Sequence, residues 1–412
     1  MAQSSVTLYG TLDVGYSGAQ YNKGDGNYIQ RQGIAFGAAD TSRWGLTGKD
    51  YLGGGLSSEF KIESQIGTAG PRGGLGGTGI ATNGAVSVKD YTMDAGIAGG
   101  TAGAVNGTSS GFGTDVTVLG NRELWVALNN ANSGTTLKVG YGVTALRQLA
   151  VETDATQGNN YGNLIGHVVG GIRRSGIRVD QAVNSSLTAS VEAFGAAQKN
   201  TLGTTGANTN GIGNGDTLVT KGYTANLQYK QGPVNAGIGY DTAAGVSPAY
   251  TQAAGTSTSA GLVNQGLGVA SAATALAANN ITNTTLAAVS YDLGTAKLFG
   301  QIWQQKYTDQ SVTTGVGSGT WKGESVGVRV PVGKVTYFGQ YYTGKNQVTV
   351  VAGTGESRKV TGPSAGVKYD FSKRTYAYFN AGYLKTDASA SSSAGTDGLK
   401  FKQTSAGLVT YF

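Results

Sequence analysis

Polar and apolar residues alternate in short segments along the chain, and each segment predicts a β-strand with one apolar and one polar face. Residues 41–66, TSRWGLTGKDYLGGGLSSEFKIESQI, place two such segments on either side of a Gly-rich turn. In the second segment, apolar Phe60 and Ile62 flank Lys61, so the charged side chain falls on the opposite face. This stretch therefore predicts an amphipathic β-hairpin.

The pattern repeats up to the C-terminus, and the connections between segments alternate in length. Seven short turns alternate with eight longer loops, predicted at 17–39, 67–120, 143–173, 197–221, 242–283, 305–322, 344–361 and 385–398. Fifteen connections join sixteen strands. Short turns gathered at one end are typical of a membrane barrel, whereas a soluble sandwich mixes loop lengths and uses Greek-key connections. We predict an all-β fold, a sixteen-stranded antiparallel transmembrane β-barrel, with residues 1–412 as one domain.

Composition agrees with a membrane barrel. Charged residues make up 13% of the chain, about half of the roughly 25% found in soluble domains. No stretch approaches the roughly 18 consecutive apolar residues of a transmembrane helix, but alternating strands of a membrane barrel do not need one. Because hydrocarbon cannot satisfy free backbone groups, such a sheet must close on itself. About sixteen strands then leave an aqueous channel.

The sequence lacks the residues that several other functional classes require. The chain has no cysteine and a single histidine, His167, so thiolate sites and histidine clusters are excluded, and we expect no metal or other cofactor. No G-x-S-x-G motif accompanies the histidine, and we expect no enzymatic activity. The formal charge is +7, but the basic residues are spread singly, so we expect no nucleic-acid partner.

Five segments carry a family resemblance: SSVTLYGTLDVGY, SRWGLTGKDYLGGGLSSEFKIES, NRELWVALNN, KYDFSKRT and the C-terminal GLVTYF. Together they resemble the general porins of Gram-negative bacteria, of the β-proteobacterial type. The resemblance implies a homotrimer in the outer membrane, passing small hydrophilic solutes and ions and contacting lipid and lipopolysaccharide. It also implies that the third long loop, residues 143–172, folds inward as a constriction, and that insertion machinery reads Phe412. The loop at 67–120 is expected to contact a neighbouring subunit.

Candidate pore-lining residues come from the third loop and from side-chain parity, that is, from the alternation that places even- and odd-numbered residues of a strand on opposite faces. They are Asp13, Arg43, Lys61, Glu63, Lys138, Arg174 and Arg178 on the wall, Arg147, Glu152 and Asp154 on the loop, and Arg173 or Arg174 as the counterpart of a family arginine. Loop acids that face a basic wall would create a transverse field across the pore. The inward basic residues and the net charge predict weak anion selectivity. Alternatively, Arg43 braces the wall through an ion pair with Glu63.

The family's G-R-Q arginine before the third loop is absent, because Gly140-Tyr141-Gly142 stands there, and Arg147 is the candidate replacement. Two other functions use the same barrel. One is a substrate-specific outer-membrane channel. The other is a surface recognition protein, such as an adhesin or phage receptor, that uses the loops at 67–120 and 242–283.

Overall fold

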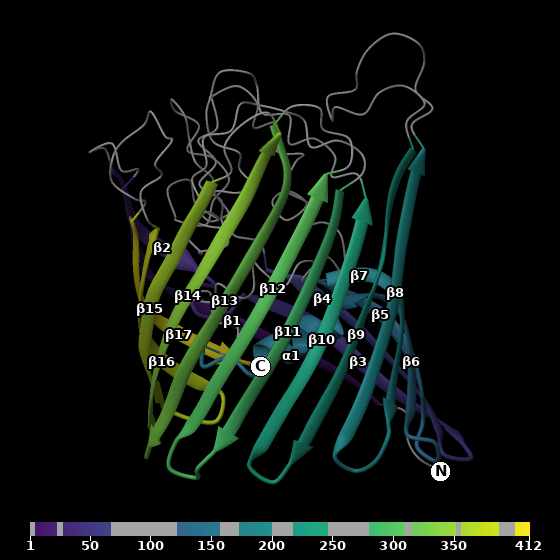
Figure 1. The fold of residues 1–412 in the computed structure, drawn as a ribbon. Coiled ribbons are helices and arrows are strands. Elements are labelled where there is room, and N and C mark those ends of the chain that lie inside the picture. The colour runs from purple at the N-terminus through teal and green to yellow at the C-terminus, as the bar shows by residue number, and fades with distance from the viewer. Residues whose placement is uncertain are drawn as a thin grey trace.

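The chain folds as a β-barrel, and the described residues include one helix (Figure 1). The computed structural model describes residues 5–22, 28–66, 122–156, 173–199, 217–245, 280–309, 315–351, 356–386 and 400–412. The strands are β1 Ser5–Asn22, β2 Tyr28–Phe36, β3 Arg43–Gly53, β4 Leu56–Gln65, β5 Glu123–Asn130, β6 Thr135–Val143, β7 Arg173–Ala182, β8 Leu187–Lys199, β9 Thr217–Gln231, β10 Val234–Gly245, β11 Asn280–Asp292, β12 Lys297–Asp309, β13 Gly315–Val332, β14 Val335–Val351, β15 Glu356–Asp370, β16 Thr375–Thr386 and β17 Lys400–Tyr411. The helix is α1, Ala145–Glu152. Within these ranges, no helix is long and apolar enough to span a membrane.

The sheet is a closed antiparallel ring of sixteen positions. Strands that follow one another in the chain pair, except for β2 and β3, which both pair with β1, and β1 pairs with β17 to close the ring. The seventeen strands fill sixteen positions because β2 pairs with one half of β1 and β3 with the other half. The predicted sixteen-stranded barrel is confirmed, with its second strand divided into β2 and β3.

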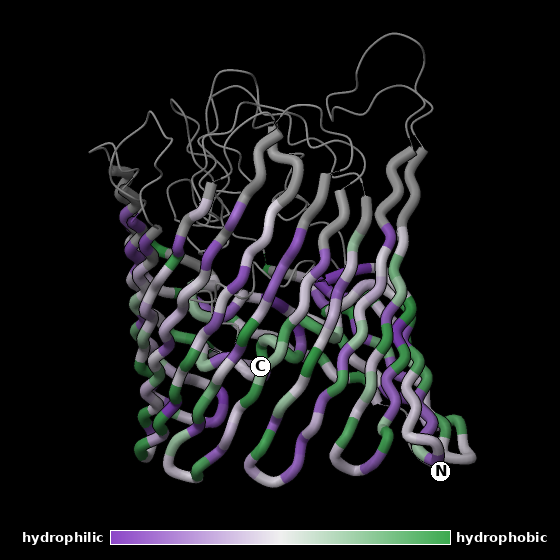
Figure 2. Tube along the Cα trace, viewed as in Figure 1, coloured by the Kyte–Doolittle hydropathy of each residue, from purple (hydrophilic) through white to green (hydrophobic). Residues whose placement is uncertain are grey.

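The strands have an apolar outer face and a polar inner face, as the sequence predicts. Figure 2 shows hydrophobic and hydrophilic residues interspersed along the strands. In β12, Ile302 is 59% exposed whereas the adjacent Gln301 is 3% exposed. In β13, Val326 is 63% exposed and the adjacent Ser325 is 5% exposed. Apolar side chains that are exposed on one face of a closed sheet are suited to contact with lipid.

The seven predicted short turns all lie at one end of the barrel (Figure 1). Exposed Tyr291, Tyr369 and Phe371 lie at this end, where the ring of Tyr369 meets that of Phe371 edge-on with centroids 5.0 Å apart. Aromatic side chains at such a level are typical of a membrane–water interface.

At the opposite end, the strands extend into ranges that the sequence predicts as loops. Much of the stretch 17–39 is the hairpin of β1 and β2, and 344–361 holds the ends of β14 and β15. Backbone pairing between strands continues beyond the level at which the apolar alternation of the sequence stops. The predicted loops are therefore too long. The loop at 67–120 lies outside the described residues.

Candidate functional site

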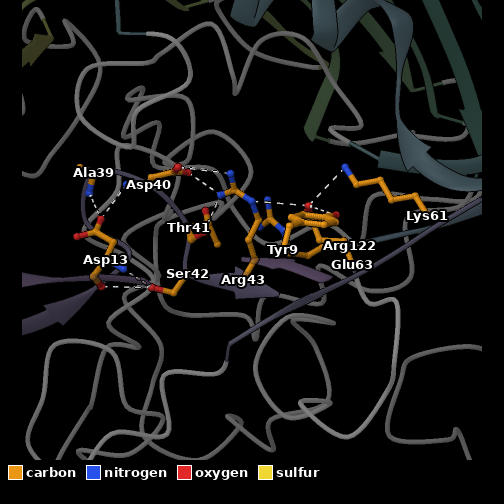
Figure 3. Close-up of polar contacts among 10 residues, drawn as sticks. All are labelled: Tyr9, Asp13, Ala39, Asp40, Thr41, Ser42, Arg43, Lys61, Glu63 and Arg122. Atoms are coloured by element: carbon orange, nitrogen blue, oxygen red, sulfur yellow. Dashed lines mark hydrogen bonds and ion pairs between the residues drawn. The ribbon is translucent and has the colours of Figure 1, made fainter. Parts of the chain in front are cut away.

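Three basic side chains form ion pairs with one buried carboxylate on the inner wall (Figure 3). The side chain of Glu63 on β4 is 4% exposed. Its oxygens lie 2.7 Å from Nε of Arg122, 3.4 Å from Nζ of Lys61 and 3.6 Å from Nε of Arg43. The hydroxyl of Tyr9 donates a further hydrogen bond at 3.0 Å. We call Arg43, Lys61, Glu63 and Arg122 the Glu63 cluster.

Further carboxylates complete the pairing around this cluster. Nζ of Lys61 lies 2.9 Å from Glu123, which also accepts a 2.8 Å hydrogen bond from Nε1 of Trp125. Arg43 donates to Asp40 at 2.7 Å. The predicted ion pair of Arg43 with Glu63 is thus present, but Glu63 is shared with Arg122 and Lys61. The wall is braced by a network rather than by one pair.

The basic side chains continue around the wall on β6 and β7. Nζ of Lys138 lies 4.3 Å from the ring centroid of Trp125, a cation–π contact. Arg178 pairs with Asp180 at 2.8 Å and reaches the side chain of Gln148 on α1 at 3.3 Å. These contacts join Lys138 to β5, and they join Arg178 to Asp180 of its own strand and to the helix.

The two arginines at the start of β7 differ in their surroundings. Arg174 forms a forked hydrogen bond with both oxygens of Asp241 on β10, and its guanidinium lies 4.0 Å from the ring centroid of Phe194. Nε of Arg173 is buried and makes no hydrogen bond within the described residues. Both arginines lie at the same end of β7, so it stays a prediction that one of them is the counterpart of the family arginine.

The helix α1 lies against the inner face of β8–β11. Leu146 and Leu149 are fully buried, and a Cβ built on Gly239 or Gly237 would collide with them. Gly237 and Gly239 flank Ile238, which is 54% exposed on the outer face, so the helix packs on the opposite, inner side. Bare glycine backbone thus creates the space that the two leucines fill.

After the helix, the chain is held to β12 and β13. Nε2 of Gln301 donates to the carbonyl of Ala150 at 2.7 Å and to the hydroxyl of Thr153 at 2.8 Å. Arg329 donates to the carbonyl of Ala155.

In the ring of sixteen positions, β12 is eight places from β4. This part of the third loop therefore lies on the wall opposite the Glu63 cluster. Residues 157–172, including His167, lie outside the described part of the chain, so the full constriction stays a prediction.

The two candidate acids of the loop differ in their positions. Glu152 lies 2.7 Å from Nζ of Lys230 and accepts hydrogen bonds from Gln228 and Gln148 at 2.7 and 3.1 Å. Asp154 is 1% exposed and accepts a hydrogen bond from the hydroxyl of Thr156. Asp154 is therefore enclosed beside the wall, which differs from its predicted exposure to the pore.

Burial acts to raise the pKa of Glu152, but the contacts from Lys230, Gln228 and Gln148 outweigh it and hold this pKa below the ordinary value. A carboxyl whose folded-state pKa is lowered stabilises the fold above its unfolded pKa, about 4.3, and loses that contribution as pH falls through the folded pKa. We therefore expect the protection of the α1 amides against hydrogen exchange, corrected for the intrinsic pH dependence, to fall as the pH drops through the folded pKa of Glu152. In Glu152→Gln this protection should not change over the same pH range. Parallel pH dependence in both proteins would contradict the anchoring role.

Asp13 occupies a different place from the predicted pore lining. Its side chain is fully buried under the break between β2 and β3. Oδ2 accepts hydrogen bonds from the amides of Ala39 and Asp40 at 2.7 and 2.8 Å, and Oδ1 accepts one from the hydroxyl of Tyr378 at 2.8 Å (Figure 3 shows the two amide contacts). Gly37 at the break has φ +76°, which glycine adopts readily. Asp13 thus satisfies backbone donors where the strand pairing stops.

Sequence reasoning missed several members of the wall network. Arg122 was not selected because it precedes β5, where strand parity does not apply, although it lies in the NRELWVALNN segment. Glu123, Asp241 and Arg329 were missed because their partners are distant in sequence. The candidate Arg147 lies on α1, where its amide donates to the hydroxyl of Thr144 that caps the helix. Within the described ranges, no group of acidic or histidine side chains could hold a metal ion.

Comparisons with known proteins agree with the fold. A family model described as "Gram-negative porin" matches residues 1–389. The chain is 47% identical over 66 residues to outer membrane porin protein 32 of Delftia acidovorans, covering 16% of this chain and 18% of that protein. It is 41% identical over 73 residues to an outer membrane porin protein of Bordetella pertussis, covering 15% of this chain and 19% of that protein. These matches therefore span about a fifth of each curated relative.

Solved structures match over the whole chain. An anion-selective porin from Comamonas acidovorans is 20% identical with a TM-score of 0.61, covering 100% of both chains. OmpT, an outer membrane protein of Vibrio cholerae, is 11% identical with a TM-score of 0.58, covering 99% of this chain and 98% of its own. At these identities the likeness is one of fold.

Proposed function

The chain belongs to the Gram-negative porin family, and from this membership we propose that it is a passive diffusion channel for small hydrophilic solutes and ions in the outer membrane. The observation that carries the proposal is the closed ring of sixteen strand positions, apolar outside and lined inside by ion pairs on β3–β10. A barrel of this size has an interior too wide for wall side chains alone to fill.

We further propose that the channel weakly prefers anions. In the Glu63 cluster, the side chains of Arg43 and Lys61 are 22% and 24% exposed, whereas that of Glu63 is 4% exposed. Arg174 is likewise more exposed than its partner Asp241. Glu63 and Asp241 therefore lie behind their cations, and a passing ion meets the positive charge of these two groups first. Asp40 and Asp180 are more exposed than Arg43 and Arg178 and offset part of this charge, which keeps the preference weak. The relative from Comamonas acidovorans is described as anion-selective, which agrees with this preference.

A planar-bilayer recording tests both proposals. The purified protein is expected to form ohmic channels, with a reversal potential in a KCl gradient that favours chloride. Arg43→Ala removes a partly exposed positive charge and leaves Asp40 without that partner, so the chloride-to-potassium permeability ratio should fall about twofold. Lys373→Gln, in an exposed short turn, is the matched control. Absence of ohmic channels would contradict the proposed channel function, whereas a preference for potassium would contradict only the proposed anion selectivity.

The assembly and its partners are proposed on the same premise. Exposed apolar side chains such as Val6, Leu8 and Val126 give the barrel an outer surface suited to lipid and to neighbouring subunits of a homotrimer. The third loop, 143–172, would narrow the pore, because residues 145–156 already lie on the inner wall. Contact of the 67–120 loop with a neighbour, and recognition of Phe412 by insertion machinery, stay predictions.

A further inference from the structure

The residues between β2 and β3 do not fit into the sheet. Val14 of β1 pairs with Phe36 at the end of β2, and Thr11 of β1 pairs with Arg43 at the start of β3. Two residues of β1 separate these pairs, whereas the six residues 37–42 separate them on the other side. The additional residues must leave the sheet, because paired strands advance together. We call residues 37–42 the inward bulge.

The contacts of the inward bulge place it on the pore side of the wall. Ala39 is 5% exposed and belongs to a buried cluster with Tyr378 of β16. The next residue of that strand, Phe379, is 50% exposed on the outer face, so Tyr378 faces inward. The amides of Ala39 and Asp40 donate to Asp13, which also accepts a hydrogen bond from Tyr378. The bulge is therefore held over the inner face by its own set of hydrogen bonds.

The inward bulge provides partners for the guanidinium of Arg43. Nη1 donates to Oδ1 of Asp40 at 2.7 Å and to the carbonyl of Thr41 at 2.8 Å, and Nη2 donates to Oδ2 of Asp40 at 3.4 Å. Nε lies 3.6 Å from Glu63. Figure 3 shows the guanidinium between Asp40 and Glu63. Each of its three nitrogens thus faces an oxygen of the chain, although the side chain is 22% exposed.

The carboxylate of Asp40 takes the position that a carboxylate solute would take. A guanidinium presents its N–H groups as a planar fork that matches the two oxygens of a carboxylate. At Arg43, the fork of Nη1 and Nη2 is filled by the two oxygens of Asp40. A passing anion therefore meets the positive charge of Arg43 but finds no open pair of donors. Conduction requires such weak contacts, because an ion that binds tightly does not leave.

We propose that Asp40 is a tethered counter-ion, which the inward bulge places against Arg43 so that this arginine attracts small carboxylates without retaining them. The inference rests on the pore of the proposed function. The side chain of Asp40 is 30% exposed, more than that of Arg43, so its charge also acts on passing ions. Removal of Asp40 opens the fork of Arg43 as a binding site for small carboxylates and strengthens the preference for anions.

Binding is tested by NMR titration of the full-length protein, folded in a nonionic detergent, with succinate as the probe. Asp40→Ala should bind succinate about tenfold more tightly than the parent does, because a charged pair of donors becomes available. In the double variant Asp40→Ala, Arg43→Ala, this gain should be absent. Asp370→Ala is the matched control, since Asp370 pairs with Lys368 at 2.9 Å and both side chains are 36% exposed. A lysine offers no fork, so this control should bind succinate as the parent does.

Planar-bilayer recordings of the same proteins measure the consequence for transport. In Asp40→Ala, the chloride-to-potassium permeability ratio should rise about twofold, and succinate should block the chloride current at concentrations that leave the parent current unchanged. Asp40→Glu returns a carboxylate and should restore the behaviour of the parent in both experiments. If Asp40→Ala does not fold, Asp40→Asn takes its place, because it keeps the shape of the side chain.

Three results would each overturn the proposal: succinate binding that is unchanged in Asp40→Ala, an equal gain in the Asp370→Ala control, or a gain that persists without Arg43. A parent protein that forms no ohmic channels would contradict the channel function instead. The two failures are distinguishable because the NMR titration measures binding without conduction.

Discussion

Replacing Glu63 with glutamine is expected to lower the free energy of unfolding of the barrel by about 3–5 kcal/mol. The carboxylate is nearly fully enclosed and lies within 4 Å of Arg43, Lys61 and Arg122. Its removal leaves three cations with less counter-charge at a wall position where water screens them poorly. The same change should increase the preference for chloride, because the cluster gains positive charge.

Urea unfolding in lipid vesicles, followed by tryptophan fluorescence, measures this loss. Glu59→Gln is the matched control on the same strand, because Glu59 pairs with Lys49 at 2.7 Å but both side chains are about a third exposed. Exposed pairs contribute about 0–1 kcal/mol, so this control should shift the midpoint little. If the two variants unfold alike, the Glu63 cluster does not brace the wall.

The double variant Leu146→Ala, Leu149→Ala is expected to detach α1 from the wall. Each leucine is fully buried, and truncation of a buried leucine costs about 2–5 kcal/mol. Because this energy holds a loop rather than the sheet, we expect the barrel to keep its unfolding midpoint while the pore becomes noisier and admits larger solutes. The hydrogen bonds of Gln301 and the contacts of Glu152 with Lys230 and Gln228 would then hold the end of the helix.

Open-channel noise and liposome swelling with sugars of increasing size measure this effect. Val151→Ala is the control, since Val151 lies on the same helix and is only partly buried. An unchanged size limit in the double variant would show that the helix does not contribute to the constriction. A loss of the folded barrel itself would show that the helix supports the sheet.

The strand alternation and the number of strand positions follow from the sequence because they are local properties. Successive side chains of a strand point to opposite faces, so a run such as residues 56–65 identifies its own inner and outer residues. Parity placed Lys61, Glu63, Lys138 and Arg178 on the inner wall, where the structure has them. Turn length, which is also local, identified the two ends of the barrel.

What each inner residue touches was decided only by the tertiary structure. Glu63 meets Arg122 because β4 pairs with β5 across the whole stretch 67–121, and no local pattern reports that pairing. Asp13 is buried because the break between β2 and β3 covers it, although its parity is that of a pore-lining residue. Local geometry sets the face of a side chain, whereas its neighbours depend on register and closure, which are properties of the whole ring.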